Sequence, residues 1–267
     1  MNSSRRRFYI KPNDVLDLND GGFLADPDTE FGQFGSSAIR RFEDIESLAC
    51  LCFLGEPGMG KSTTLTSLHS GCIKPAKFVD LRPYSTSQDL RAAVFESPEY
   101  RDWLQGQHVL TPFLDSLDEC LLRVDNAAAV LIEGLSSAPT ERLHLRIASR
   151  TSDWQQTLEK RLREKYGDAA VGVFELAPLR RIDVLNEAEA GGVSDPAGFL
   201  TEVIQREAVP LAVKPISLNF LIKEYKSSRG LPLTRSKLYE QGCLCLCDES
   251  SETRIDASPC QVPSVNP

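Results

Sequence analysis

A glycine-rich segment that ends in lysine, serine and threonine is the part of the sequence with the plainest chemistry. Residues 55–63 read GEPGMGKST and match the pattern G-x-x-x-x-G-K-[ST] of phosphate-binding loops. Glycine has no Cβ, so such a loop can turn its backbone N–H groups toward phosphate oxygens, and a helix after it adds the positive end of its dipole. The predicted nucleotide-binding residues of this segment are Gly55, Glu56, Pro57, Gly58, Met59, Gly60, Lys61, Ser62 and Thr63.

Three side chains of this loop have separate expected roles. Lys61 should reach the terminal phosphates, and the Ser62 hydroxyl should bind Mg²⁺. Thr63 could add a contact near the first phosphates. The alternative is a glycine-rich turn that joins two ordinary elements and binds no ligand.

The flanks of the loop favour phosphate binding over an ordinary turn. Residues 48–54 (LACLCFL) form an apolar run that is typical of a strand buried on both faces of a parallel sheet. Residues 61–71 (KSTTLTSLHSG) place Leu65 and Leu68 three positions apart and end at Gly71, which predicts a short helix with a glycine at its C-terminus. A strand, loop and helix therefore position the lysine.

A second group of candidate residues lies in the stretch FLDSLDE, residues 113–119. Asp115 ends a predicted strand, at the place where a carboxylate that holds Mg²⁺ through its water shell must stand. Asp118 and Glu119 follow closely enough to orient and deprotonate an attacking water. An acidic surface loop is the alternative, and the apolar strand before the acids argues against it.

The remaining sequence alternates between predicted strands and helices, which indicates an α/β fold with a parallel sheet flanked by helices. Residues 1–35 look loop-like, and residues 36–48 carry apolar side chains at a three-residue spacing that predicts a helix. Pro112 lacks a backbone donor, so the strand around it should be shortened to residues 113–115 or bulged. Further strands are predicted at residues 77–81, 109–115, 143–149 and 171–176, and a helix at residues 87–96.

Composition limits the partners and the location. The formal net charge is -8 and the pI is about 5.1, which argues against a broad surface for nucleic acid or anionic membranes. The one basic run, residues 3–9 (SSRRRFY), is interpreted as a solvated N-terminus. No apolar stretch is long enough to span a bilayer, and no signal-peptide pattern follows the arginines, so we expect a cytoplasmic protein. The cysteines lack paired C-x-x-C spacing, which favours reduced thiols over a metal site.

Together, the motifs GEPGMGKS, LDSLDE and RIASRT resemble those of the NACHT group of signal-transduction (STAND) ATPases, which are related to AAA+ proteins. The segment from Asp115 to Glu119 matches the acidic motif of that group position by position. The resemblance also implies a sensor motif near the γ-phosphate, formed here by Ser149 and Arg150. It implies a five-stranded parallel sheet in the spatial order fifth, first, fourth, third and second strand.

The resemblance covers roughly residues 38–249 and implies a small C-terminal helical lobe. The segments ELAPL, KPISLNFLI and LPLTRSKLYE resemble that lobe, in which Pro215 would lie near the adenine and ribose. Lys214 departs from the group, where many members have a small residue before this proline. The expected domains are an N-terminal segment with a lead-in helix at 1–47, the P-loop NTPase core at 48–179, the helical lobe at 180–249 and a disordered tail at 250–267.

The resemblance implies a molecular switch that binds ATP or ADP with Mg²⁺ and slowly hydrolyses ATP, with Glu119, Asp118 and Arg150 as the catalytic residues and Ser62 and Asp115 as the metal-binding ones. A role in signalling or defence, with self-association or an unidentified protein partner, would follow. The alternatives are a regulatory module that binds nucleotide without hydrolysis and a small-molecule kinase. The polar tail predicts a shortened or partial member of the group.

Overall fold

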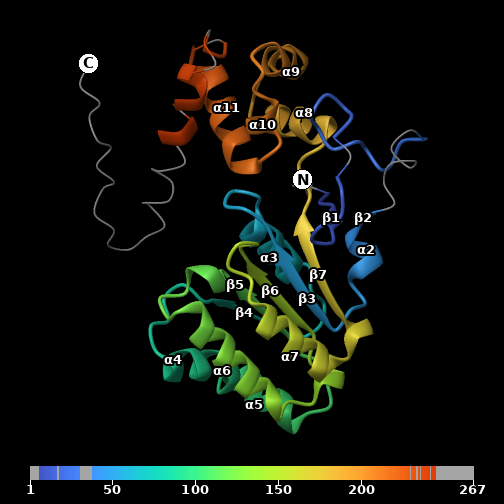
Figure 1. Cartoon of the computed structure of the whole chain (residues 1–267), viewed down its shortest axis with the longest axis vertical. Helices are drawn as coiled ribbons and strands as arrows, with labels where there is room; N and C mark the ends of the chain where they lie inside the picture. The colour runs from blue at the N-terminus through green and yellow to red at the C-terminus, as the bar shows by residue number, and fades with distance from the viewer. Residues whose placement is uncertain are drawn as a thin grey trace. The chain divides into compact units, whose positions relative to one another are not determined.

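Two units make up the part of the chain described by the computed structural model, which covers residues 6–16, 18–30, 38–228, 230–232, 234, 236–240 and 242–244. Unit 1 comprises Met1–Asp17 and Pro27–Ala177, and unit 2 comprises Leu18–Asp26 and Pro178–Pro267 (Figure 1). This division differs from the consecutive domains expected from the sequence, because a short N-terminal stretch belongs to unit 2. The predicted disordered tail lies outside the described residues.

Unit 1 contains a mostly parallel sheet with the strand order β2-β1-β7-β3-β6-β5-β4. The five parallel strands have the predicted spatial order, with the strand that precedes the phosphate loop between the fifth and the fourth. The expected α/β fold with a parallel sheet is therefore confirmed. The strands are β1 Tyr9–Ile10, β2 Ile39–Arg40, β3 Cys50–Leu54, β4 Ala76–Asp80, β5 Thr111–Asp115, β6 Leu145–Ser149 and β7 Val171–Leu176.

Helices cover both faces of this sheet. Successive apolar side chains of β3 point to opposite faces, so each face packs against its own set of helices. Cys50, Cys52 and Leu54 pack into one core with α4, α6 and α7, while Leu51 and Phe53 pack into a second core with α3. Figure 1 shows α6 and α7 in front of the strands. The helices of unit 1 are α2 Phe42–Ile45, α3 Lys61–Ser70, α4 Ser87–Phe95, α5 Pro98–Gln105, α6 Val124–Ser136 and α7 Gln156–Tyr166.

The N-terminal part of unit 1 differs from the prediction. The supposedly loop-like start contains β1, which pairs antiparallel with β7 and with β2. The predicted helix over residues 36–48 is wrong for most of its length, because Ile39–Arg40 is a strand and only Phe42–Ile45 is helical. The three-residue spacing is misleading here, since Ile39 and Ile45 are both buried but belong to different elements.

Pro112 neither shortens nor bulges β5, so that expectation is also wrong. The register between β4 and β5 runs without interruption from Ala76 opposite Thr111 to Asp80 opposite Asp115. On the other edge, β5 pairs with β6 only through Phe113 and Leu114. Pro112 lacks the N–H that a longer ladder to β6 would use, so the pairing with β6 is short. The pairing with β4 does not depend on that N–H and stays continuous.

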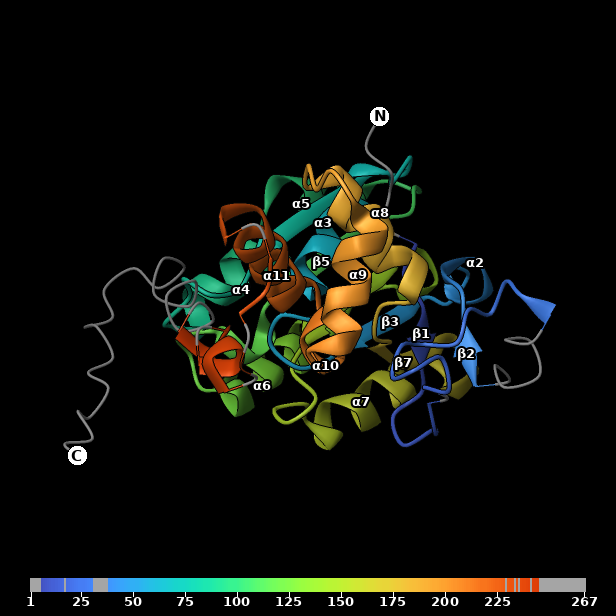
Figure 2. The same cartoon turned by 90° about the horizontal axis from the view of Figure 1, so that it is seen from above.

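The described part of unit 2 is mainly helical (Figure 2). Its core includes Phe199 and Leu218 together with Phe23 from the N-terminal stretch. Arg180 is almost fully buried and forms ion pairs with Asp183 and Asp26, which raise its pKa against the effect of burial. The helices are α8 Arg181–Ala190, α9 Pro196–Gln205, α10 Val209–Ala212 and α11 Pro215–Ser228.

None of the helices within the described residues combines the length and the apolar character required to cross a bilayer.

Arg146 is a buried cation inside the sheet and provides a test of the fold. Its guanidinium donates to the carbonyl oxygens of Glu46, Leu48 and Ala49, which join α2 to β3, and burial lowers its pKa. Arg146→Met keeps most of the volume but removes the guanidinium donor of the Glu46 and Leu48 carbonyls, while the Ala49 carbonyl keeps its hydrogen bond from Leu145 N–H. We expect a loss of about 2 to 4 kcal/mol of unfolding free energy, measured by urea denaturation.

Arg161→Met is the matched control for this substitution. Arg161 lies on the exposed side of α7 and pairs with Glu164, so its replacement should change the unfolding free energy by less than about 0.5 kcal/mol. If Arg146→Met lowers the unfolding free energy no more than the control does, the buried guanidinium does not stabilise the segment between α2 and β3.

Candidate phosphate-binding site

The loop between β3 and α3 has the backbone shape that a phosphate-binding loop requires. Gly58 and Gly60 have φ angles of 79° and 86°, in the left-handed region that side chains with a Cβ rarely adopt. Gly60 is also the N-cap residue directly before α3. These two glycines are therefore needed for the turn itself, independently of any ligand.

Backbone donors gather where this loop enters α3. Within the described part of the chain, the N–H groups of Gly58, Gly60, Lys61 and Ser62 have no hydrogen-bond acceptor. The first N–H groups of a helix have no partner inside the helix and lie at the positive end of its dipole. The arrangement therefore suits an anion with several oxygen atoms.

The Lys61 side chain folds back across the loop. Its Nζ donates to the carbonyl oxygens of Gly55 at 2.7 Å and Glu56 at 3.2 Å. Burial lowers the pKa of Lys61, and the carboxylates of Asp118 and Glu119 offset part of that effect. The ammonium group is thus held within the loop and close to acidic side chains from another element.

Asp115 ends β5 and faces the start of α3. It is 3% exposed, and among the described residues its Oδ1 atom has no hydrogen-bond partner. Burial is the main cause that raises the pKa of Asp115, while the nearby Ser62 hydroxyl lowers it. A buried carboxylate oxygen without a partner beside a serine hydroxyl provides hard oxygen ligands, so these two residues fit Mg²⁺.

Ser116 turns the chain sharply after Asp115. Its φ and ψ angles of 59° and 46° lie in the left-handed region, which is uncommon for a residue other than glycine. A short 3-10 helix, η1 Leu117–Glu119, follows directly. Such local strain is typical of functional sites and here brings Asp118 and Glu119 back toward the ends of the neighbouring strands.

Arg150, which follows β6, binds both of these acids. Its Nε lies 2.8 Å from Asp118 Oδ2, its backbone N–H donates to Asp118 Oδ1 at 2.9 Å, and its Nη2 lies 2.9 Å from Glu119 Oε1. Asp118 is buried with a 2% exposed side chain, whereas the Glu119 side chain is 42% exposed. Burial raises the pKa of Asp118, and Lys61 and Arg150 partly offset this rise.

The structure therefore brings most of the predicted site residues to one edge of the sheet in unit 1. Within the loop, Glu56 and Pro57 are exposed, whereas Met59 is 7% exposed and packs in the core with Leu65. Ser62 and Thr63 are exposed at the start of α3. Pro215 is the first residue of α11 in unit 2, and its contact with a nucleotide stays a prediction.

Two residues outside the phosphate loop and the acidic stretch also contribute polar atoms: Ser149, which the resemblance implies as part of a sensor motif, and Arg7, which was not predicted as a site residue. Ser149 pairs with Leu54 in the sheet, is fully buried, and has no hydrogen-bond partner for Oγ within the described residues. Arg7 donates to the carbonyl oxygen of Met59. Interpreting the basic run at residues 3–9 as solvated was wrong for its second half, since Phe8 and Tyr9 are each 2% exposed. The apolar residues that follow the arginines were the available signal.

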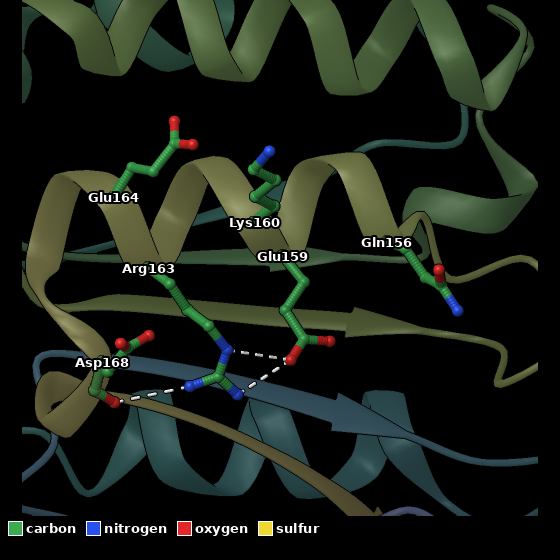
Figure 3. A pocket seen from close by; sticks show the side chains of 6 residues that line it. All are labelled: Gln156, Glu159, Lys160, Arg163, Glu164 and Asp168. Atoms are coloured by element: carbon green, nitrogen blue, oxygen red, sulfur yellow. Dashed lines mark hydrogen bonds and ion pairs between the residues drawn. The ribbon is translucent and has the colours of Figure 1, made fainter.

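A hollow of about 500 Å³ on unit 1 contains none of the predicted site residues. It is lined by charged and polar side chains of α7 and the residues after it. Arg163 donates to Glu159 and to the carbonyl oxygen of Asp168, as Figure 3 shows. Arg163 and Glu159 pair with each other on an open surface, and the hollow is not a candidate for the chemistry described above.

Lys61→Ala tests whether the loop binds phosphate. A charge-assisted hydrogen bond contributes about 1.5 to 3 kcal/mol, so the variant should bind ATP about tenfold to a hundredfold more weakly in a calorimetric titration. Lys77→Ala, which removes a lysine paired with the exposed Glu99, is the control and should bind like the parent. Equal affinities for the parent and Lys61→Ala would exclude the loop as a phosphate site.

Acidification tests the metal-binding role of Asp115. Because the pKa of its carboxyl group is raised in the folded protein, the charged form is lost as the pH falls through a value above the ordinary one for aspartate. Mg²⁺ should therefore lose its effect on ATP affinity at a pH above about 4, the ordinary range of aspartate. Titrations from pH 8 to pH 5, with and without Mg²⁺, measure this.

Asp115→Asn is the control for the acidification experiment. It has no carboxylate to titrate, so the effect of Mg²⁺ on its ATP affinity should be small at every pH. If Mg²⁺ changes the ATP affinity of the parent and of the variant in the same way from pH 8 to pH 5, a group other than Asp115 binds the metal.

Comparisons with known proteins give only distant matches. No family model and no curated protein matches the chain. Among solved structures, it is similar to the Holliday junction branch migration motor RuvB of Thermotoga maritima, with 13% identity and a TM-score of 0.44. Two substituted forms of that protein match with 12% identity and TM-scores of 0.43 and 0.44. The matches cover 73% of this chain and 61 to 62% of the others. Similarity at this level assigns no family.

Proposed function

We propose that this chain binds ATP or ADP with Mg²⁺ at the loop of residues 55–63 and slowly hydrolyses ATP, as a switch of the NACHT type. The observation that carries the proposal is the convergence of three elements at one edge of the sheet. Lys61 comes from α3, Asp115 from β5, and Asp118 and Glu119 from η1. Electrostatic coupling of Lys61 with all three acids supports their closeness.

Phosphate binding would use the backbone donors and Lys61. The N–H groups at the start of α3 and the helix dipole stabilise phosphate oxygens. The ammonium group of Lys61 exchanges its bonds to two loop carbonyls for bonds to the terminal phosphates, which are stronger because they join opposite charges. Ser62 and Asp115 would hold Mg²⁺, which supplies charge neutralisation at the phosphates when bound.

The two acids of η1 are suited to different tasks. The Asp118 side chain is buried, accepts a hydrogen bond from the backbone N–H of Arg150 and forms an ion pair with its Nε, so it fixes the end of β6 and holds the guanidinium. Glu119 is more exposed and accepts from Arg150 through Oε1, which leaves it accessible to water. We assign Glu119 as the general base: a water attacks the γ-phosphorus, its proton passes to the Glu119 carboxylate, and ADP leaves.

The switch would require unit 2 to respond to the bound nucleotide. The NACHT resemblance supports this step, and Pro215 at the start of α11 is the residue proposed to contact the base and ribose. The position of Arg150 on both acids supports a role near the γ-phosphate, where it could sense the difference between ATP and ADP. Self-association and an unidentified protein partner remain part of the proposal.

Two alternatives share the same loop. A regulatory module would bind nucleotide without turnover, and a small-molecule kinase would transfer phosphate only to an acceptor. The accessible Glu119 carboxylate favours hydrolysis over a silent module, since it provides a base beside the loop. Release of phosphate from ATP without an added acceptor distinguishes the proposed ATPase from both alternatives.

Glu119→Gln tests the proposed hydrolysis. The variant should keep the affinity of the parent for ATP and Mg²⁺ but release phosphate about 10² to 10⁴ times more slowly, which is the usual cost of losing a positioned base. Single-turnover assays with radiolabelled ATP measure the chemical step directly.

Asp118→Asn is the companion variant, because its side chain is bound by Arg150 and not open to water. It should lower the unfolding temperature more than Glu119→Gln does. If Asp118→Asn abolishes turnover in a stably folded protein and Glu119→Gln does not, the roles of the two acids must be exchanged. A parent that binds ATP but releases no phosphate would support the regulatory module.

A further inference from the structure

Arg7 connects three parts of unit 1 that are far apart in the sequence. Its Nη2 atom donates to the carbonyl oxygen of Met59, inside the phosphate loop, at 3.0 Å. The same atom donates to the carbonyl oxygen of Ala177 at 3.0 Å. A guanidinium has several donors in one rigid plane and can therefore link two acceptors in a defined geometry.

The backbone on the C-terminal side of Arg7 is firmly held. Phe8 accepts a hydrogen bond from Ala177 N–H at 2.9 Å, and Tyr9 pairs with Leu176 in the antiparallel ladder of β1 and β7. The Tyr9 ring packs against Phe53 of β3, with 5.4 Å between ring centroids. Arg7 thus lies just before a strand whose backbone and ring contacts fix it to the sheet, and its side chain extends from there toward the phosphate loop.

The contact with Met59 determines the orientation of a whole peptide group. The peptide bond is planar and trans, so its C=O and N–H point in opposite directions. When Arg7 holds the Met59 carbonyl oxygen, the N–H of Gly60 must point away from the guanidinium. That N–H is one of the donors without an acceptor at the start of α3.

The contact with Ala177 links the loop to the boundary of unit 1. Ala177 is the last residue of this unit, and the chain enters unit 2 at Pro178. The two acceptors named here are neutral carbonyl groups, so these contacts fix the direction of the guanidinium without an ion pair. Through Nη2, Arg7 connects the phosphate loop at Met59 with Ala177, the residue at which the chain leaves unit 1.

We propose that Arg7 is a positioning residue that orients the Met59–Gly60 peptide for phosphate binding and couples phosphate binding to the order of the backbone at Ala177. The inference rests on the proposed nucleotide binding and deepens it. Arg7 acts through the loop and not on the γ-phosphate. Its loss should therefore weaken ATP and ADP binding equally.

The test compares Arg7→Gln and Arg7→Lys with Arg6→Gln in the full chain. Arg6 is the matched control, because it lies one position away and pairs with Asp28 at the surface. Calorimetric titrations use ATP and ADP with Mg²⁺. Arg7→Gln should bind both nucleotides about tenfold more weakly, as expected for the loss of roughly 1.4 kcal/mol, and Arg6→Gln should stay within about twofold of the parent.

Hydrogen exchange supplies a readout that a purely structural role would not change. In the parent and in Arg6→Gln, Mg²⁺ and ATP should slow exchange of the amide of Ala177, measured in a peptide that covers residues 171–180. In both Arg7 variants, saturating nucleotide should leave that exchange rate unchanged. Arg7→Lys keeps the positive charge and most of the aliphatic part of the side chain. If Arg7→Gln fails to fold, the same affinities and exchange rates are measured on Arg7→Lys.

The outcomes separate this inference from the function on which it rests. A parent that binds neither nucleotide would overturn both. A parent that binds, with Arg7 variants indistinguishable from Arg6→Gln in affinity and exchange, would overturn the role of Arg7 alone. A larger loss for ATP than for ADP would also overturn it, because the residue would then act on the γ-phosphate and not through the loop.

Discussion

Strand β3 has hydrogen-bonded neighbours on both edges and apolar cores on both faces. Its parallel register pairs Leu54 with Ser149 of β6 and with Glu175 of β7, so the three strands end at the same level. Asp115 reaches that level because β5 pairs with β6. The candidate residues follow these strand ends, and a shift of register by one residue would turn buried side chains to the wrong face and separate the charged groups.

Burial of charge is the second feature on which the site depends. Lys61, Asp115 and Asp118 all have pKa values shifted toward the neutral form, with burial as the largest cause in each case. Desolvation of these groups opposes folding unless their charges are paired. Arg150 compensates two acids at once, while one oxygen of Asp115 has no partner among the described residues. Such unbalanced polar groups are more typical of binding sites than of structural cores.

The N-terminal part of the chain contributes to both units. Tyr9 and Ile10 form an antiparallel edge on β7, whereas Phe23 and Leu24 are fully buried in unit 2. The ion pairs of Arg180 with Asp26 and of Arg181 with Asp20 hold that stretch on the side of α8. The N-terminal segment, which was predicted to be loop-like, therefore supplies core residues to both units. Through Arg7 it also contacts the phosphate loop.

Local sequence predicted the loop, the helix after it and the parallel strands, because glycine spacing, apolar runs and turn residues act over short distances. The spatial order of those strands was implied by the resemblance to the NACHT group and not by any local pattern. Local sequence also predicted which acids end β5. Tertiary structure alone decided that Asp118 is buried on Arg150 while Glu119 stays accessible, since their exposure depends on β6. Pairing of β1 with β7 likewise overrode the three-residue period before β3. Contacts between residues that are distant in the chain produce no regular pattern in a single sequence. The contact of Arg7 with the phosphate loop and the packing of residues 18–26 in unit 2 could therefore not be predicted.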